Sequence, residues 1–283
     1  MILIFYLYFC LVKWLKNIFD FYINSSLHVA LSVLSLAVVT VLKFDVQIES
    51  RVLVFIFLAS VTGYNFVKYA GIARFQHRRL TPNLKIIQVF SLLVFLGLGY
   101  VFFLQKIEVI LTAISLGIFT AFYAIPFLPG AKNLRSLQSL KIFVIGLVWT
   151  GTVVLMPLAG KVDLISKDVL YYFIEIFLLV LVLMFPFEIR DLKFDDENLK
   201  TLPQVLGIKK TKILGFVFLT LILAIDFYLF GNSKHQFLIT LLVMSLLGVL
   251  LLKSKIYQAK YYSSFLVEAI PVLWLILLMS FTN

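Results

Sequence analysis

The sequence predicts an all-α integral membrane protein. Hydrophobic residues make up 62% of the 283 residues and charged residues only 14%, and the mean hydropathy is +1.06. This composition leaves too little polar surface to cover a soluble globule of this length. The apolar residues also gather into stretches of about 20, which is the length that a helix needs to cross a bilayer.

Nine such stretches predict nine transmembrane helices, and several connections are so short that neighbouring helices must be antiparallel. No Pro-, Gly- or Ser-rich linker, low-complexity tract or soluble insertion interrupts them, so we expect a single helical domain over residues 1–283. The predicted spans cover residues 21–42, 51–73, 84–104, 107–125, 140–159, 168–187, 212–230, 236–252 and 264–281.

The N-terminal segment is apolar but has no basic residue before it and no small-residue cleavage site after it, which argues against a cleaved signal peptide. We expect residues 1–18 to form a helix at the membrane interface, with Lys13 and Lys16 toward the lipid headgroups. Residues 19–283 then form the nine-helix bundle. The single cysteine, Cys10, cannot form an intramolecular disulfide, so helix packing alone must stabilise the fold.

Basic residues are distributed unevenly between the two ends of the predicted bundle. The N-terminal segment and the even-numbered connections carry 18 of the 25 Lys and Arg residues. Because cytoplasmic loops are enriched in Lys and Arg, we expect a cytoplasmic N-terminus and an outside C-terminus in a cytoplasmic membrane of bacterial type. The net charge of +11 then reflects topology and anionic lipid, and no nucleic-acid partner is expected. The odd-numbered connections carry Lys43, Arg51, Lys106, Lys161, Lys167 and Lys234.

The densest charge cluster spans residues 188–197, where five carboxylates follow an apolar span directly. Asp191 and Asp195 are four positions apart, so on a helix they lie on one face about 6 Å apart. That separation lets them share a divalent ion. Taken alone, the cluster would equally suit a solvated turn of acids and bases.

The continuation of this cluster supplies a resemblance. Thr201-Leu202-Pro203 followed by Gly207, together with the acidic cluster, resembles the second aspartate-rich region of the UbiA superfamily of intramembrane prenyltransferases. Asp191 and Asp195 fall on the two family aspartates, and the connection to the tail is about one residue shorter than usual. The likeness extends more weakly over roughly residues 55–215, and it implies a UbiA-like bundle of nine helices.

The first aspartate-rich region of that family, approximately NDxxDxxxD, is degenerate in this chain. Aligning Asn65 with the family asparagine places Phe66, Tyr69 and Ala73 where three aspartates should be. None of these side chains can hold a metal ion as a carboxylate does. Lys68 is a candidate cation for a diphosphate or for the aspartates of the second region, although it lies roughly 200° round the helix from Phe66. The alternative is a lysine that extends to the interface or is paired near the helix end.

The resemblance implies a prenyltransferase in which Asp191 and Asp195 hold Mg²⁺, and the ion stabilises the diphosphate that leaves an isoprenoid donor. No residue is assigned a catalytic role. The expected partners are membrane lipid and an isoprenoid diphosphate or other prenyl lipid, and no protein partner is evident. The candidate diphosphate-binding residues are Arg74, Arg78, Arg79, Lys132 and Arg135, and the candidate cavity residues are Asn65, Lys68, Tyr69, Tyr123 and Glu188.

Loss of the first-region aspartates leaves a second interpretation open, a non-catalytic protein that binds a lipid or isoprenoid on the same fold. Three further carboxylates, Glu175, Asp226 and Glu268, lie within or near the predicted spans. We expect each to face protein or water, or to be protonated, because an ionised carboxylate in lipid is costly. They form no evident relay and no inverted repeat is visible, which makes a transporter the more distant interpretation.

Overall fold

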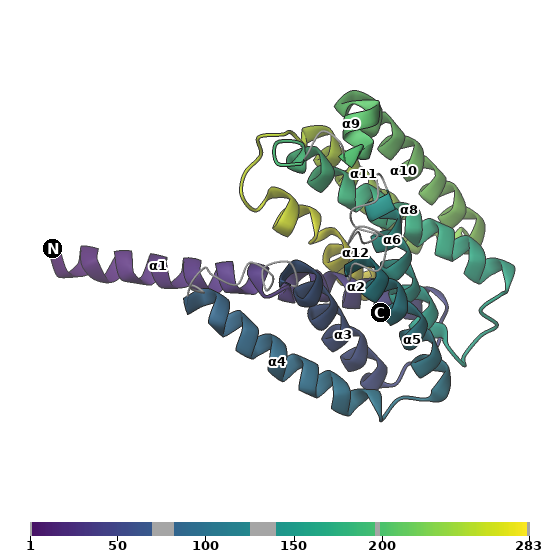
Figure 1. Cartoon of the computed structure of the whole chain (residues 1–283). Helices are drawn as coiled ribbons and strands as arrows, with labels where there is room; N and C mark the ends of the chain where they lie inside the picture. The colour runs from purple at the N-terminus through teal and green to yellow at the C-terminus, as the bar shows by residue number, and fades with distance from the viewer. Residues whose placement is uncertain (1, 70–81, 125–139, 196–198, 282–283) are drawn as a thin grey trace.

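The computed structural model describes residues 2–69, 82–124, 140–195 and 199–281, and every regular element in these ranges is helical (Figure 1). The prediction of an all-α protein is therefore confirmed. In chain order the elements are α1 (Ile2–Asn24), α2 (Leu27–Lys43), α3 (Ser50–Tyr69), α4 (Pro82–Phe102), α5 (Ile107–Ala124), α6 (Leu140–Thr150), the π turn η3 (Gly151–Leu155), α7 (Met156–Leu158), α8 (Lys167–Asp191), α9 (Leu202–Leu206), α10 (Ile208–Phe230), α11 (Lys234–Lys253), the π turn η5 (Tyr262–Val267) and α12 (Ile270–Phe281).

Seven of the described helices are long and apolar enough to cross a membrane. The number of candidate spans rises to eight if one bent span is formed by the pair Val12–Asn24 and Leu27–Lys43. A shorter apolar helix covers Ile107–Tyr123. Each of the nine predicted ranges overlaps one of these helices, so the positions of the apolar segments were predicted well. The number of membrane crossings stays a prediction.

The N-terminal boundary differs from the prediction. A separate interfacial helix was expected to end at residue 18, but α1 runs without interruption to Asn24 and the chain then bends by 54° into α2. Ser26, at the bend, has a positive φ of 63°, a conformation that non-glycine residues adopt only when neighbouring contacts hold it. Figure 1 shows α1 projecting from the side of the bundle.

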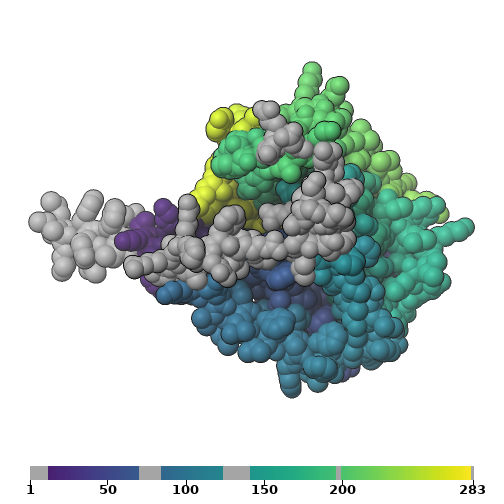
Figure 2. Space-filling model, viewed as in Figure 1, coloured from purple at the N-terminus to yellow at the C-terminus, as the bar shows by residue number. Residues whose placement is uncertain are grey.

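Helix α8 is central to the bundle and packs against α10 on one side and α6 on another (Figure 1). In its spanning segment 61% of the residues are buried inside the protein, against 6% for α4. Most of the surface of α4 is therefore left for lipid, and Figure 2 shows this helix along the lower edge of the molecule. Since α8 is enclosed, its two ends are held in fixed positions.

One basic residue that was assigned to a connection lies inside the bundle instead. Lys43 is the last residue of α2 and is buried. The predicted span ends at residue 42, which puts Lys43 in the first connection. Its burial requires acidic partners, which the structure supplies from α8 and α10.

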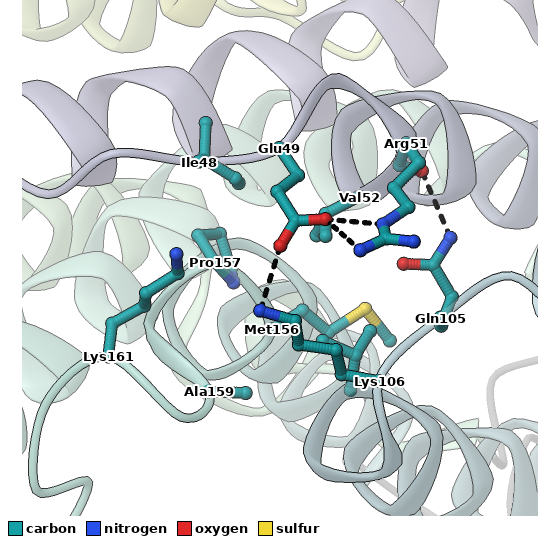
Figure 3. A pocket seen from close by; sticks show the side chains of 11 residues that line it. Ile48, Glu49, Arg51, Val52, Gln105, Lys106, Met156, Pro157, Ala159 and Lys161 are labelled. Atoms are coloured by element: carbon teal, nitrogen blue, oxygen red, sulfur yellow. Dashed lines mark hydrogen bonds and ion pairs between the residues drawn. The ribbon is translucent and has the colours of Figure 1, made fainter.

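A small surface pocket lies near this end of the bundle, where the connection before α3 meets the start of α5 (Figure 3). Glu49 pairs there with Lys106 at 2.9 Å and with Arg51. These hydrogen-bonded cations, Lys106 first, lower the pKa of Glu49. Because the pairs are exposed, they add little to stability, and the pocket contains none of the candidate site residues.

The tightest helix packing predicts the effect of an added methyl group. A Cβ at Gly215 of α10 would overlap Leu251 and come within 3.2 Å of Phe185, whereas a Cβ at Gly117 of α5 would meet nothing within 4 Å. We expect Gly215→Ala to lower the free energy of unfolding by about 1–3 kcal/mol through overpacking. Gly117→Ala should leave it unchanged or raise it, because alanine favours the helix. Equal unfolding midpoints of the two variants in detergent would contradict this packing of α10.

Candidate functional site

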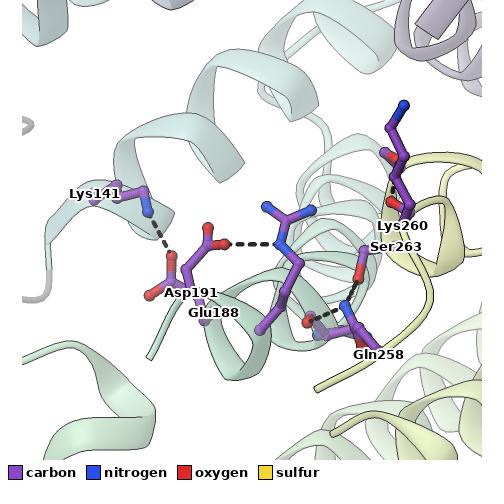
Figure 4. A network of polar contacts seen from close by, with 9 residues as sticks. Lys141, Glu188, Asp191, Gln258, Lys260 and Ser263 are labelled. Carbon is purple, nitrogen blue, oxygen red and sulfur yellow. Dashed lines mark hydrogen bonds and ion pairs between the residues drawn. The ribbon is translucent and has the colours of Figure 1, made fainter. Parts of the chain in front are cut away.

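The end of α8 places a carboxylate inside the bundle. Glu188 is buried, with 2% of its surface exposed, and its Oε1 accepts a hydrogen bond of 2.9 Å from Lys141 Nζ at the start of α6. Figure 4 shows these side chains near Asp191. Asp191 and Asp195 also lie close enough to Glu188 to interact with it electrostatically. Lys141 thus compensates the charge of this buried carboxylate.

The two aspartates keep helical spacing at the helix end. Asp195 N–H donates to the backbone oxygen of Asp191 at 2.9 Å, which continues the helical turn past the end of α8. The carboxylate of Asp191 accepts a hydrogen bond of 2.8 Å from Arg190 Nε, and its side chain is 23% exposed. Two carboxylates one turn apart are suited to a hard cation such as Mg²⁺.

The tail of the motif has a structural explanation. Thr201 begins the short helix α9, and its backbone N–H donates to Gln204 Oε1 at 2.9 Å. Pro203 occupies the first turn of α9, where a missing N–H costs nothing. Gly207 has a φ of 78°, which glycine adopts without strain, and it separates α9 from α10. The tail therefore directs the chain from α8 into α10 and need not take part in chemistry.

Polar residues of the degenerate first aspartate-rich region, on α3, form hydrogen bonds to residues 24–26, the joint between α1 and α2. Asn65 is buried; its Oδ1 accepts from Ser26 Oγ at 2.8 Å and its Nδ2 donates to Ser25 O at 3.0 Å. Lys68 Nζ and Tyr69 OH both donate to Asn24 O, at 3.0 and 2.8 Å. These bonds hold the backbone where α1 ends and explain how Ser26 keeps its left-handed conformation.

The hydrogen bond of Lys68 goes to the α1 backbone at Asn24, and its role as a cation at the site stays a prediction. Phe66, at the position of the first missing aspartate, is 44% exposed. Tyr123 is buried on α5 and lies near enough to Lys141 to interact with it electrostatically. Asn65, Lys68 and Tyr69 thus have structural partners, which a sequence pattern could not disclose.

Glu268 interacts electrostatically with one cation from each of the two regions, Lys68 and Arg190. It follows the π turn η5, and its backbone oxygen accepts a hydrogen bond from Ser32. Among the described residues its carboxylate has no hydrogen bond or ion pair, and Lys68 and Arg190 are the cations that act on it electrostatically. π turns are frequent at functional sites. The signal that points to Glu268 is a lone carboxylate in an apolar span.

The remaining predicted site residues lie outside the described part of the chain. Within that part, no group of three or more His, Cys, Asp or Glu side chains could hold a metal ion. The predicted residues outside the described ranges are Ala73, Arg74, Arg78, Arg79, Lys132 and Arg135.

Comparison with known proteins identifies the fold. No family model and no curated protein matches the sequence. Among solved structures, a UbiA homolog from Archaeoglobus fulgidus bound to GPP and Mg²⁺ aligns over 92% of this chain and 98% of its own, with a TM-score of 0.59 and 11% identity. A UbiA homolog from Aeropyrum pernix K1 in the apo state aligns over 91% and 99%, with a TM-score of 0.59 and 16% identity.

A third similar structure is a digeranylgeranylglyceryl phosphate synthase. It aligns over 94% of this chain and 98% of its own, with a TM-score of 0.57 and 15% identity. Such low identities establish a shared fold and no shared activity. With the apolar helices, this likeness makes the chain a multi-pass integral membrane protein.

The pair of Lys141 and Glu188 predicts a coupled effect on stability. Lys141→Met should lower the free energy of unfolding by roughly 2–4 kcal/mol, because it leaves the buried carboxylate of Glu188 without a counter-charge. Lys141→Met/Glu188→Gln should recover most of that loss, and Lys161→Met, an exposed lysine at the other end, should have little effect. Additive single effects in this double-mutant cycle would show that the two side chains do not interact.

The joint between α1 and α2 predicts a second stability effect. Asn65→Ala should cost about 2–4 kcal/mol, because Ser25 O and Ser26 Oγ lose their buried partner. It should also speed proteolysis at the joint, whereas Asn17→Ala, at an exposed position of α1, should change neither property. An unchanged unfolding midpoint and cleavage rate in Asn65→Ala would mean that the joint is held by other contacts.

Proposed function

Because this chain has the UbiA superfamily fold, we propose that it is a membrane prenyltransferase, which moves a prenyl group from an isoprenoid diphosphate to an acceptor. The observation that carries the proposal is the pair Asp191 and Asp195, one helical turn apart at the end of α8. Binding of GPP and Mg²⁺ by a UbiA homolog of the same fold supports it. The substrate class follows from that likeness and from the membrane location.

The residues present fit a single Mg²⁺. Asp191 and Asp195 would hold it, and Mg²⁺ commonly binds one or two carboxylates and completes its shell with water and substrate phosphates. When bound, the ion would offset negative charge on the departing diphosphate. The degenerate first region offers no carboxylate for a second ion, since Phe66 and Tyr69 stand at two of its three positions.

Basic side chains of the chain itself would supply the missing positive charge. Arg190 pairs with Asp191 at 2.8 Å in the described state and would turn to the diphosphate once a cation occupied the carboxylate. Lys68 lies on the opposing helix α3 and faces the same region as Glu268 and Arg190. The predicted diphosphate contacts complete the set: Arg74, Arg78, Arg79, Lys132 and Arg135.

The proposal includes a topology. The nine apolar segments would each cross the membrane, with residues 21–42 as a first span that bends at the α1–α2 joint and residues 1–18 at the interface. All 283 residues would form one helical domain in a cytoplasmic membrane of bacterial type. An odd number of crossings then separates a cytoplasmic N-terminus from an outside C-terminus, as the distribution of Lys and Arg favours.

A second candidate function has its own supporting observation. Asn65, Lys68 and Tyr69 hold the α1–α2 joint, and Tyr69 aligns with one of the family's aspartates, so this part of α3 serves the structure here. This supports a non-catalytic protein that binds an isoprenoid or other lipid in the UbiA cavity. Such a change would weaken stabilisation of the transition state in particular, because that stabilisation depends on charged groups that are already in position before the reaction.

Release of diphosphate distinguishes the two candidates. For the lipid-reconstituted protein with allylic prenyl diphosphates and crude membrane acceptors, we expect Mg²⁺-dependent release. Asp191→Asn/Asp195→Asn should reduce it by about 10²-fold or more. Asp45→Asn is the matched control: Asp45 is exposed, and its φ of 49° suits asparagine. Release that persists in the double variant would refute the metal assignment, and donor binding without release would favour the second candidate.

A further inference from the structure

Three charged side chains meet inside the bundle, far from the candidate site. Lys43 of α2, Glu175 of α8 and Asp226 of α10 have side chains that are 1%, 0% and 1% exposed. Lys43 Nζ contacts Asp226 Oδ1 and lies 3.5 Å from Glu175 Oε1. Glu175 is 13 positions before Glu188 on α8, a distance of about 20 Å along the helix. The cluster is therefore separate from the acidic end of α8.

Aromatic rings enclose the ammonium group of Lys43. Its Nζ lies 4.7 Å from the ring centre of Phe230, 4.9 Å from Trp274 and 5.8 Å from Tyr172. The faces of such rings attract a cation, most strongly where water is absent. Together with the contact to Asp226, this shell favours a charged lysine.

The charges of the cluster do not balance. With all three groups ionised, two carboxylates face one ammonium and the net charge is −1. An uncompensated charge is strongly unfavourable in a dry interior. The only other titratable group that faces the cluster within the described ranges is the neutral phenol of Tyr172, which accepts a hydrogen bond of 3.3 Å from Thr40. One more positive charge is therefore needed.

The hydrogen bonds show which carboxylate lacks support. Asp226 contacts Lys43 through Oδ1, and its Oδ2 has no hydrogen bond in the described structure. Neither oxygen of Glu175 has a hydrogen bond there, although Oε1 lies 3.5 Å from Lys43 Nζ. The indole N–H of Trp274, which is fully buried, also has no acceptor. Buried polar atoms without partners need a physical explanation, and an ionised Glu175 provides none.

We propose that Lys43, Glu175 and Asp226 form a proton-binding site within the membrane, in which Lys43 and Asp226 are the ion pair and Glu175 holds the proton. One ammonium, one carboxylate and one carboxylic acid sum to zero charge. A neutral Glu175 can also donate a hydrogen bond, which an ionised one cannot. The site does not depend on the proposed prenyl transfer.

Two matched amide variants test the assignment. Glu175→Gln has the shape and neutrality of the protonated acid, so its unfolding midpoint in detergent should equal that of the unmodified protein. Asp226→Asn removes the partner of Lys43 and should shift the unfolding equilibrium by roughly a hundredfold or more toward the unfolded state. Failure of Glu175→Gln to fold, or a loss as large as that of Asp226→Asn, would overturn the proposal.

A double variant and a spectroscopic signal keep the test decisive if Asp226→Asn does not fold. Lys43→Met/Asp226→Asn should regain stability, because a neutral Glu175 needs no counter-charge; no recovery would contradict the assignment. The infrared carbonyl band of a protonated carboxylic acid should be present at neutral pH and lose intensity in Glu175→Gln. If that difference is absent and sodium ions stabilise the protein instead, the bound species is a metal cation and the proposal is wrong.

Discussion

The structure depends on one constraint, that a charge inside an apolar bundle must have a compensating partner. Lys141 meets this need for Glu188 at one end of α8, and Lys43 meets it for Asp226 toward the other. Both pairs join α8 or its neighbour α10 to a helix that is distant in sequence. Because α8 is the enclosed central helix, these pairs also fix the end that carries Asp191.

The same constraint applies to the first region on α3. Aspartates there would need a cation in place to be tolerated. Tyr69, which aligns with one of these aspartates, instead donates a neutral hydrogen bond to Asn24 O. This position therefore carries no charge requirement and helps to hold the joint between α1 and α2.

The acidic region shows that a motif can combine chemistry with folding. The chain passes through α9 into α10 with the help of three residues. Thr201 caps α9, Pro203 has a fixed φ in its first turn, and Gly207 has a positive φ at its end. Their survival shows that the local path of the backbone is kept. The case for prenyl transfer depends on Asp191 and Asp195.

The sequence by itself determined the helical membrane class and the positions of the apolar segments, because composition and length act locally. Tertiary structure alone decided that Lys43 is buried, that Lys141 pairs with Glu188 and that Asn65 binds the α1–α2 joint. The partners in these contacts are 183, 47 and 39 or 40 positions apart. No local pattern specifies such distant pairs, since they form only when packed helices bring them together.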